Sequence, residues 1–258
     1  MQTRLPSAYS AANFVGPLIA GFTIDHSGYA MACLYIAIFS MAPSLMLLVR
    51  GSGLPEGERH ETPATGGIET LLAEPGIKKL LAASGLLLTG QDLYRVYMPV
   101  YGHDIGLSAT DIGIILAAFP AASFFVRLIL QYLISIFKED RLLAVAFYVT
   151  AVCLLLMPLF TTTLMLSVVS FILGLGMGCS QPIITMLMFS NSPKGRSGEA
   201  MGLRMTVVHF TRLLGPVVFG AIGSAFGLLP MFWFNALMMS AGGWLSRPET
   251  ANRAGSDR

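Results

Sequence analysis

The sequence predicts an all-α polytopic membrane protein with eight transmembrane helices. Hydrophobic residues make up 54% of the 258 residues and charged residues only 12%, whereas soluble domains carry about 25% charged residues. The apolar residues form blocks of roughly 20, the length that a helix needs to cross a hydrocarbon core about 30 Å thick. Lysine and arginine gather between alternate blocks. This composition excludes a soluble enzyme, a nucleic-acid-binding protein and a disordered regulator.

The apolar blocks divide the chain into two helices, a linker, six helices and a tail. Residues 1–50 hold the first two blocks. Residues 51–79 are rich in Gly, Pro and Glu, which is typical of a solvated linker. Residues 80–246 hold the other six blocks, and residues 247–258 form a polar tail. The predicted spans are residues 5–24, 27–49, 80–102, 112–137, 142–160, 164–189, 200–223 and 225–246.

The basic residues predict the orientation. Eight spans place both termini on one side of the membrane, and lysine and arginine favour the cytoplasmic side. The opposite loops contain neither, and one of them is acidic through Asp104 and Asp111. We therefore expect a plasma (inner) membrane protein with cytoplasmic termini and linker. The residues on the cytoplasmic face are Arg4, Arg50, Arg59, Lys78, Lys79, Lys138, Arg141, Lys194, Arg196, Arg247, Arg253 and Arg258.

Cofactors and metals are not expected. Cys33, Cys153 and Cys179 each lie alone inside an apolar block, without a Cys or His at ligand spacing. The one embedded aspartate and the one embedded histidine lie on different spans, so an intramembrane enzyme is not expected either.

The first and seventh spans share a glycine and proline pattern. Glycines at this spacing let helices approach closely, and proline permits a bend. Each copy is followed by one more span, which indicates two duplicated halves of a transporter. We interpret these residues as helix-packing motifs: Gly16, Pro17 and Gly21 in the first copy, and Gly215, Pro216 and Gly220 in the second.

Three segments resemble the major facilitator superfamily, in particular its bacterial efflux-type members. Residues 192–216 are similar to the loop before the family's eleventh helix and to that helix. Residues 106–127 resemble its seventh-to-eighth connection and eighth helix. Residues 12–21 resemble the antiporter signature of the fifth helix, with Ala12 and Ala20 in place of two glycines.

The resemblance covers nearly the whole chain but begins at the fifth helix of twelve. It implies a partial, N-terminally truncated fold, with residues 1–50 as the last two helices of the N-terminal bundle. Residues 80–246 would form the complete six-helix C-terminal bundle. The implied function is alternating-access transport of a small solute, with proton-coupled efflux by antiport. The alternative is a non-functional remnant, or a transporter with a misassigned start site.

The expected partners are the lipid bilayer, a small-molecule substrate and H⁺, without nucleic acid. We expect a monomer, or a chain that needs a missing N-terminal segment of four helices. The 258 residues alone are not expected to sustain coupled transport, because alternating access rocks one bundle against another.

Polar residues inside the spans mark the candidate substrate and proton pathway. An ionisable group at mid-span costs about 2.5–3.5 kcal/mol on insertion scales, so its position is informative. The spans at residues 27–49, 142–160 and 225–246 have none, and the resemblance implies that these face lipid. The candidates are Gln91, Asp92, Arg95, Arg127, Gln131, Gln181, His209 and Arg212.

Each candidate has two interpretations. Asp92 and Arg95 either neutralise each other or act as a protonation site and an anchor for an anionic group. His209 is either a proton relay or a hydrogen-bonded packing residue. Arg127 either lines the pathway or extends its charged end to the headgroups, as long cationic side chains do near helix ends, and Arg204 is expected to extend to the headgroups as well.

Two further patterns favour structural roles. Tyr94, Tyr97 and Tyr101 are interpreted as an outer aromatic belt. The glycine run at residues 174–178 is interpreted as helix packing, because it lies inside an uncharged span with no strand before it, unlike a dinucleotide-binding loop.

Overall fold

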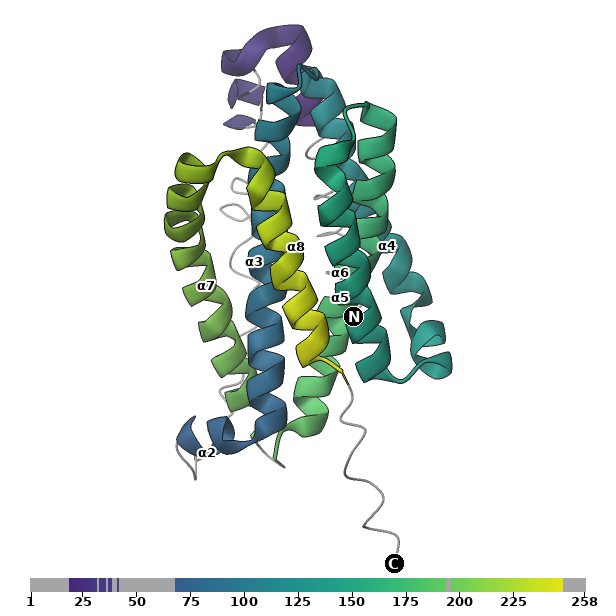
Figure 1. Ribbon diagram of the computed structural model, residues 1–258, viewed down its shortest axis with the longest axis vertical. Helices are drawn as coiled ribbons and strands as arrows, with labels where there is room; N and C mark the ends of the chain where they lie inside the picture. Colours follow the sequence, from purple (N-terminus) through teal and green to yellow (C-terminus); the bar gives the residue numbers. More distant parts are fainter. Residues whose placement is uncertain are drawn as a thin grey trace, which may run out of the picture.

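The computed structural model describes residues 19–31, 33–35, 37–38, 41, 68–193 and 196–247, and every regular element in these ranges is helical. The long helices run alternately in opposite directions and pack side by side (Figure 1). The prediction of an all-α fold is confirmed for this part of the chain. The elements are α2 (Ile68–Ala73), α3 (Pro75–Asp104), α4 (Ala109–Ile136), α5 (Glu139–Leu156), the 3₁₀ helix η2 (Met157–Leu159), α6 (Thr163–Asn191), α7 (Ser197–Phe226) and α8 (Leu228–Leu245).

Four of the described helices are long and apolar enough to cross a membrane: α4, α5 together with η2, α6 and α8. The predicted spans at residues 80–102 and 200–223 correspond to α3 and α7, each 30 residues long, whose polar residues lower their hydropathy. The first two predicted spans lie largely outside the described residues. Eight membrane helices therefore stay a prediction.

The helix boundaries follow local chemistry. Ser108 is the N-cap of α4, and its hydroxyl oxygen accepts a hydrogen bond from the Asp111 amide at 3.1 Å. Gly227 joins α7 to α8 with φ +82°, a conformation that only glycine adopts without strain. The helix α3 begins at Pro75, before the predicted start at residue 80, and α2 lies inside the predicted linker with Leu71 fully buried.

Helices α4 and α6 form the most extensive contact between described elements. Gly178 makes this close approach possible, since a Cβ there would lie 2.6 Å from the Ser123 Cα. A Cβ at Gly174 would overlap the carbonyl oxygen of Phe119. The Ser123 hydroxyl donates to the Gly174 carbonyl at 3.0 Å. The interpretation of this glycine run as helix packing is confirmed.

Helices α5 and α8 pack on each other, and their outer faces are apolar. Val152 on α5 and Trp233, Leu237 and Trp244 on α8 are all at least half exposed. An exposed apolar surface of this kind suits contact with lipid chains. It agrees with the expectation that the uncharged spans at residues 142–160 and 225–246 face the bilayer.

The three tyrosines of α3 bind neighbouring segments through their hydroxyl groups. Tyr94 is 1% exposed and donates to the Ser170 hydroxyl at 2.9 Å. Tyr97 donates to the Phe219 carbonyl at 2.7 Å, and buried Tyr101 donates to the Phe160 carbonyl at 3.0 Å. The prediction of an aromatic belt is wrong for Tyr94 and Tyr101, because these buried hydroxyls tie α3 to its neighbours.

The helical residues 19–31 pack against the start of α4, at the end of the molecule opposite α2 (Figure 1). The Asp25 carboxylate accepts hydrogen bonds from the backbone amides of Ala109 at 3.0 Å and Thr110 at 2.7 Å. A Cβ at Gly21 would lie 2.5 Å from the Ala109 carbonyl oxygen. Hydrogen bonds from Thr110, with a smaller contribution from the Ala109 amide, hold the pKa of Asp25 below its ordinary value.

Candidate functional site

A polar cavity of about 230 Å³ lies among α3, α4, α6 and α7. Its lining combines charged and amide side chains with apolar ones such as Leu88, Phe119 and Val208. Six of the eight predicted pathway residues line this cavity. Helical spacing groups residues on one helix, but it could not show that residues from separate helices share one cavity. The polar lining residues are Gln91, Arg95, Ser123, Arg127, Gln181, Arg204, His209 and Arg212.

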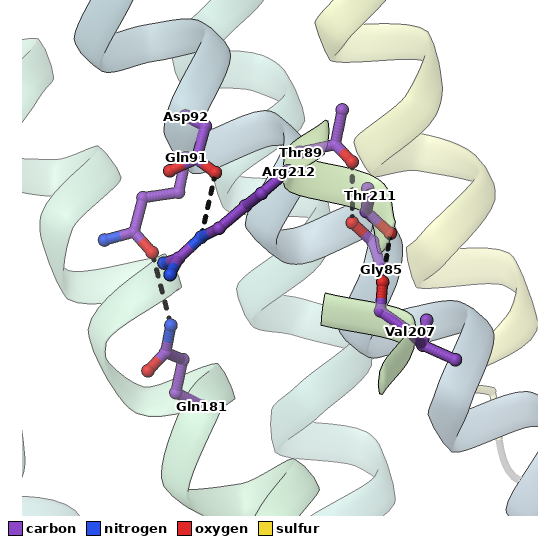
Figure 2. A network of polar contacts seen from close by, with 8 residues as sticks. All are labelled: Gly85, Thr89, Gln91, Asp92, Gln181, Val207, Thr211 and Arg212. Carbon is purple, nitrogen blue, oxygen red and sulfur yellow. Dashed lines mark hydrogen bonds and ion pairs between the residues drawn. The ribbon is translucent and has the colours of Figure 1, made fainter. Parts of the chain in front are cut away.

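Two amide side chains cross the cavity between α3 and α6. The Gln181 Nε2 group donates to the Gln91 Oε1 atom at 3.2 Å (Figure 2). Both side chains are half-buried. Each amide keeps further donors and acceptors, so this pair can rearrange around a polar solute without leaving all of its groups unsatisfied.

Asp92 pairs with Arg212 across the boundary between α3 and α7. The Arg212 Nε group lies 3.3 Å from the Asp92 Oδ2 atom, and the two side chains point toward each other in Figure 2. The interpretation of Asp92 and Arg95 as a neutralising pair does not match this geometry: the ion-pair partner of Asp92 is on another helix. A charged link between two helices can be broken by protonation of the carboxylate.

A second, more apolar cavity of about 420 Å³ adjoins the Asp92–Arg212 pair between α3 and α7. Leu93, Val96 and Phe219 line it, and Arg95 and Arg212 line both cavities. Two threonines in its wall satisfy their hydroxyls within their own helices, Thr89 on the Gly85 carbonyl at 2.8 Å and Thr211 on the Val207 carbonyl at 2.7 Å (Figure 2). The part of the wall formed by Thr89 and Thr211 is therefore effectively apolar.

Arg204 belongs to the cavity although it was not among the predicted pathway residues. Its side chain is 6% exposed, and its Nε group donates to the Ser84 hydroxyl of α3 at 3.1 Å. Arg204, Val208 and Arg212 are spaced by four residues and share one face of α7, a signal that would have placed Arg204 in the cavity. Arg204 and Arg127 both line the cavity, whereas extension to the headgroups was expected for Arg204.

Gln131 and Asp92 are the two predicted pathway residues that do not line the polar cavity. Gln131 is exposed on α4, one turn beyond Arg127. Asp92 lines the apolar cavity beside it.

The predicted packing motifs lie in different surroundings. A Cβ at Gly215 or Gly220 would meet no described atom within 4 Å, and both glycines line the apolar cavity. Pro216 lies within α7, and Gly21 packs on α4. Gly16 and Pro17 lie outside the described residues. A packing role for the second copy stays a prediction.

The helical fold and the polar cavity together indicate the class of protein. A bundle of apolar helices around a polar cavity is the architecture of membrane proteins that bind polar solutes. Comparison with known proteins identifies the family. The model of the Major Facilitator Superfamily matches residues 2–216 and 80–258, which together cover almost the whole chain. The chain belongs to the major facilitator superfamily, so this prediction is confirmed.

Two curated relatives support this assignment. The chain is 19% identical over 247 residues to the uncharacterized MFS-type transporter MJ1560 of Methanocaldococcus jannaschii, covering 93% of this chain and 63% of the relative. It is 22% identical over 228 residues to the multidrug resistance protein MdtG of Klebsiella pneumoniae, covering 86% of this chain and 55% of that protein. The chain thus spans a little over half the length of these relatives. Family and apolar helices together identify an integral membrane protein related to transporters, not to enzymes.

Proposed function

We propose that the protein moves a small solute across the inner membrane by alternating access, in a proton-coupled efflux reaction. The observation that carries the proposal is the polar cavity among α3, α4, α6 and α7. Transporters of this architecture bind their substrates near the middle of the membrane and expose the site to one side at a time. Efflux as the direction is supported by the multidrug resistance relative.

Asp92 is the proposed proton site. Within the described helices α3 to α8 it is the only acidic residue far from a helix end. In its ionised form it pairs with Arg212 on α7 at 3.3 Å. Protonation would remove the attraction and release Arg212, so the proton state of one carboxylate would control a contact between two helices.

The proposed orientation has both termini in the cytoplasm. It is supported by the position of Lys79, Asp140, Asn191 and Arg247, which line one small cavity at a single end of the bundle. We expect external thiol reagents to label Asp104→Cys and not Glu61→Cys in whole cells. Labelling at Glu61→Cys, or protection at Asp104→Cys, contradicts this topology.

We further propose that transport requires a four-helix segment in addition to these 258 residues. The support is the greater length of the two relatives and the alternating movement of two bundles. The test uses liposomes with an imposed proton gradient and a panel of anionic, neutral and cationic solutes. Both the chain alone and the chain joined to the first four helices of a relative are reconstituted.

We expect gradient-driven flux from the joined protein and only the background of empty liposomes from the chain alone. Robust flux from the 258-residue chain would show that the segment is not needed. Background flux from both proteins, for every solute, contradicts the proposed transport and favours a non-functional remnant.

A further inference from the structure

The polar cavity carries an excess of positive charge. Arg95, Arg127, Arg204 and Arg212 line it, and no carboxylate is among its described lining residues. Asp92, beside it, forms its described ion pair with Arg212. Among the described residues of this site, Asp92 offsets Arg212, while Arg95 and Arg204 have no described carboxylate, so the site carries positive charge.

Two of these arginines have no carboxylate partner in the described part of the chain. Among the described residues, the side chain of buried Arg204 donates to the Ser84 hydroxyl, a neutral group. Half-buried Arg95 lines both cavities and makes no described ion pair. Each guanidinium has five N–H donors, and keeping such a charge within apolar helices is costly unless an anion compensates it.

The adjoining apolar cavity defines the rest of the ligand. Leu93, Val96 and Phe219 line a space of about 420 Å³, within the range of small-molecule pockets. Arg95 and Arg212 stand at the boundary of the two cavities. A ligand held there by an anionic head would have apolar surface available for its remaining atoms.

We propose that the substrate of this transporter is a soluble amphipathic organic anion. Its carboxylate, sulfonate or phosphate head binds Arg95 and Arg204, and its apolar body lies against Leu93, Val96 and Phe219. Guanidinium groups suit such a head because they donate two parallel hydrogen bonds to its oxygens. This inference rests on the proposed function, since it names the solute that the same cavity would move.

Binding can be measured without transport. The 258-residue chain is placed in nanodiscs of neutral phosphatidylcholine and titrated by calorimetry with naphthalene-2-sulfonate. The matched ligands are 2-naphthylmethylammonium, with a similar ring and the opposite charge, and methanesulfonate, with the same head and no body. We expect the naphthalene sulfonate to bind, the ammonium ion not to bind, and methanesulfonate to bind at least tenfold more weakly because it buries no ring.

Substitutions at Arg95 test whether this side chain binds the anionic head of the ligand. Arg95→Gln should weaken naphthalene-2-sulfonate binding at least tenfold, because it removes a charge-assisted hydrogen bond. Arg95→Lys keeps the charge but not the planar guanidinium group, so its affinity should lie between those of the parent chain and Arg95→Gln. Arg141→Gln, at an exposed site outside both cavities, is the matched control and should bind like the parent chain. Recovery with lysine separates loss of the anchor from loss of folding.

Several results would overturn the inference. These are no binding of the sulfonate, equal binding of the ammonium ion or of methanesulfonate, and unchanged affinity in Arg95→Gln. Loss of sulfonate binding in discs that contain phosphatidylglycerol would assign the anion to a lipid headgroup and also overturn it. Anion binding by the chain without flux from the joined protein contradicts only the transport proposal. Flux of other solutes by the joined protein without anion binding contradicts only the substrate class.

Discussion

Asp92→Asn should abolish proton-driven transport while leaving the protein folded and expressed. Asparagine has nearly the same shape and can still accept a hydrogen bond from Arg212, but it is neutral and takes up no proton. The ion pair across α3 and α7, at 3.3 Å in the parent chain, would lose its charge on one side permanently. Coupling then fails, because the contact no longer depends on pH.

The measurement is flux of a transported solute with and without an imposed proton gradient, in the joined protein described above. We expect Asp92→Asn to equilibrate solute down its own gradient and to ignore the proton gradient. Asp140→Asn, an exposed carboxylate in the first turn of α5, is the matched control and should remain coupled. If flux through Asp92→Asn still follows the proton gradient, Asp92 is not the proton site.

Gly174→Ala should destabilise the bundle by about 1–3 kcal/mol in free energy of unfolding, the usual cost of overpacking a close contact. The new methyl group would overlap the Phe119 carbonyl oxygen and lie 2.9 Å from the Phe119 Cα. These are backbone atoms, which cannot rotate away as a side chain does. Helices α4 and α6 would have to separate, and the hydrogen bond from Ser123 to the Gly174 carbonyl would lengthen.

Unfolding midpoints in detergent test this expectation. Gly202→Ala is the control, because a Cβ there meets no described atom within 4 Å. Alanine also favours a helix over glycine by about 1 kcal/mol, so this control should be neutral or slightly stabilising. Gly178→Ala should behave like Gly174→Ala, since its Cβ would lie 2.6 Å from the Ser123 Cα. Equal unfolding midpoints for Gly174→Ala and Gly202→Ala would show that α4 and α6 accommodate the methyl group without loss of stability.

Most of the cavity lining could be predicted from the sequence, because a charged side chain inside an apolar helix faces protein or water and not lipid. Gln91, Asp92, Arg95 and Gln181 were all expected on the pathway. Gln91, Arg95 and Gln181 line one cavity, whereas Asp92 lines the adjoining one. The partner of Asp92 could not be predicted. Helical spacing identifies neighbours on the same helix, such as Arg95, whereas the ion pair with Arg212 depends on how α7 packs against α3.

The tyrosines of α3 show a second limit of sequence patterns. An aromatic residue near the end of a span suits the membrane interface, but its hydroxyl group is equally able to bind a buried carbonyl or hydroxyl on another helix. Tyr94 does so with Ser170. The choice depends on whether a neighbouring helix offers an acceptor, and only the tertiary packing supplies that information.

The contact between Asp25 and the start of α4 depends on pH only under strongly acidic conditions. The hydrogen bonds keep the pKa of Asp25 below its ordinary value of 3.8. Stabilisation from this contact is therefore fully present above pH 3.8 and lost only as the pH falls through the lowered value. Acidification in the physiological range leaves the carboxylate ionised and both backbone amides bound. The hydrogen bonds from Ala109 and Thr110 to Asp25 therefore act as a pH-independent link between residues 19–31 and α4 across the physiological range.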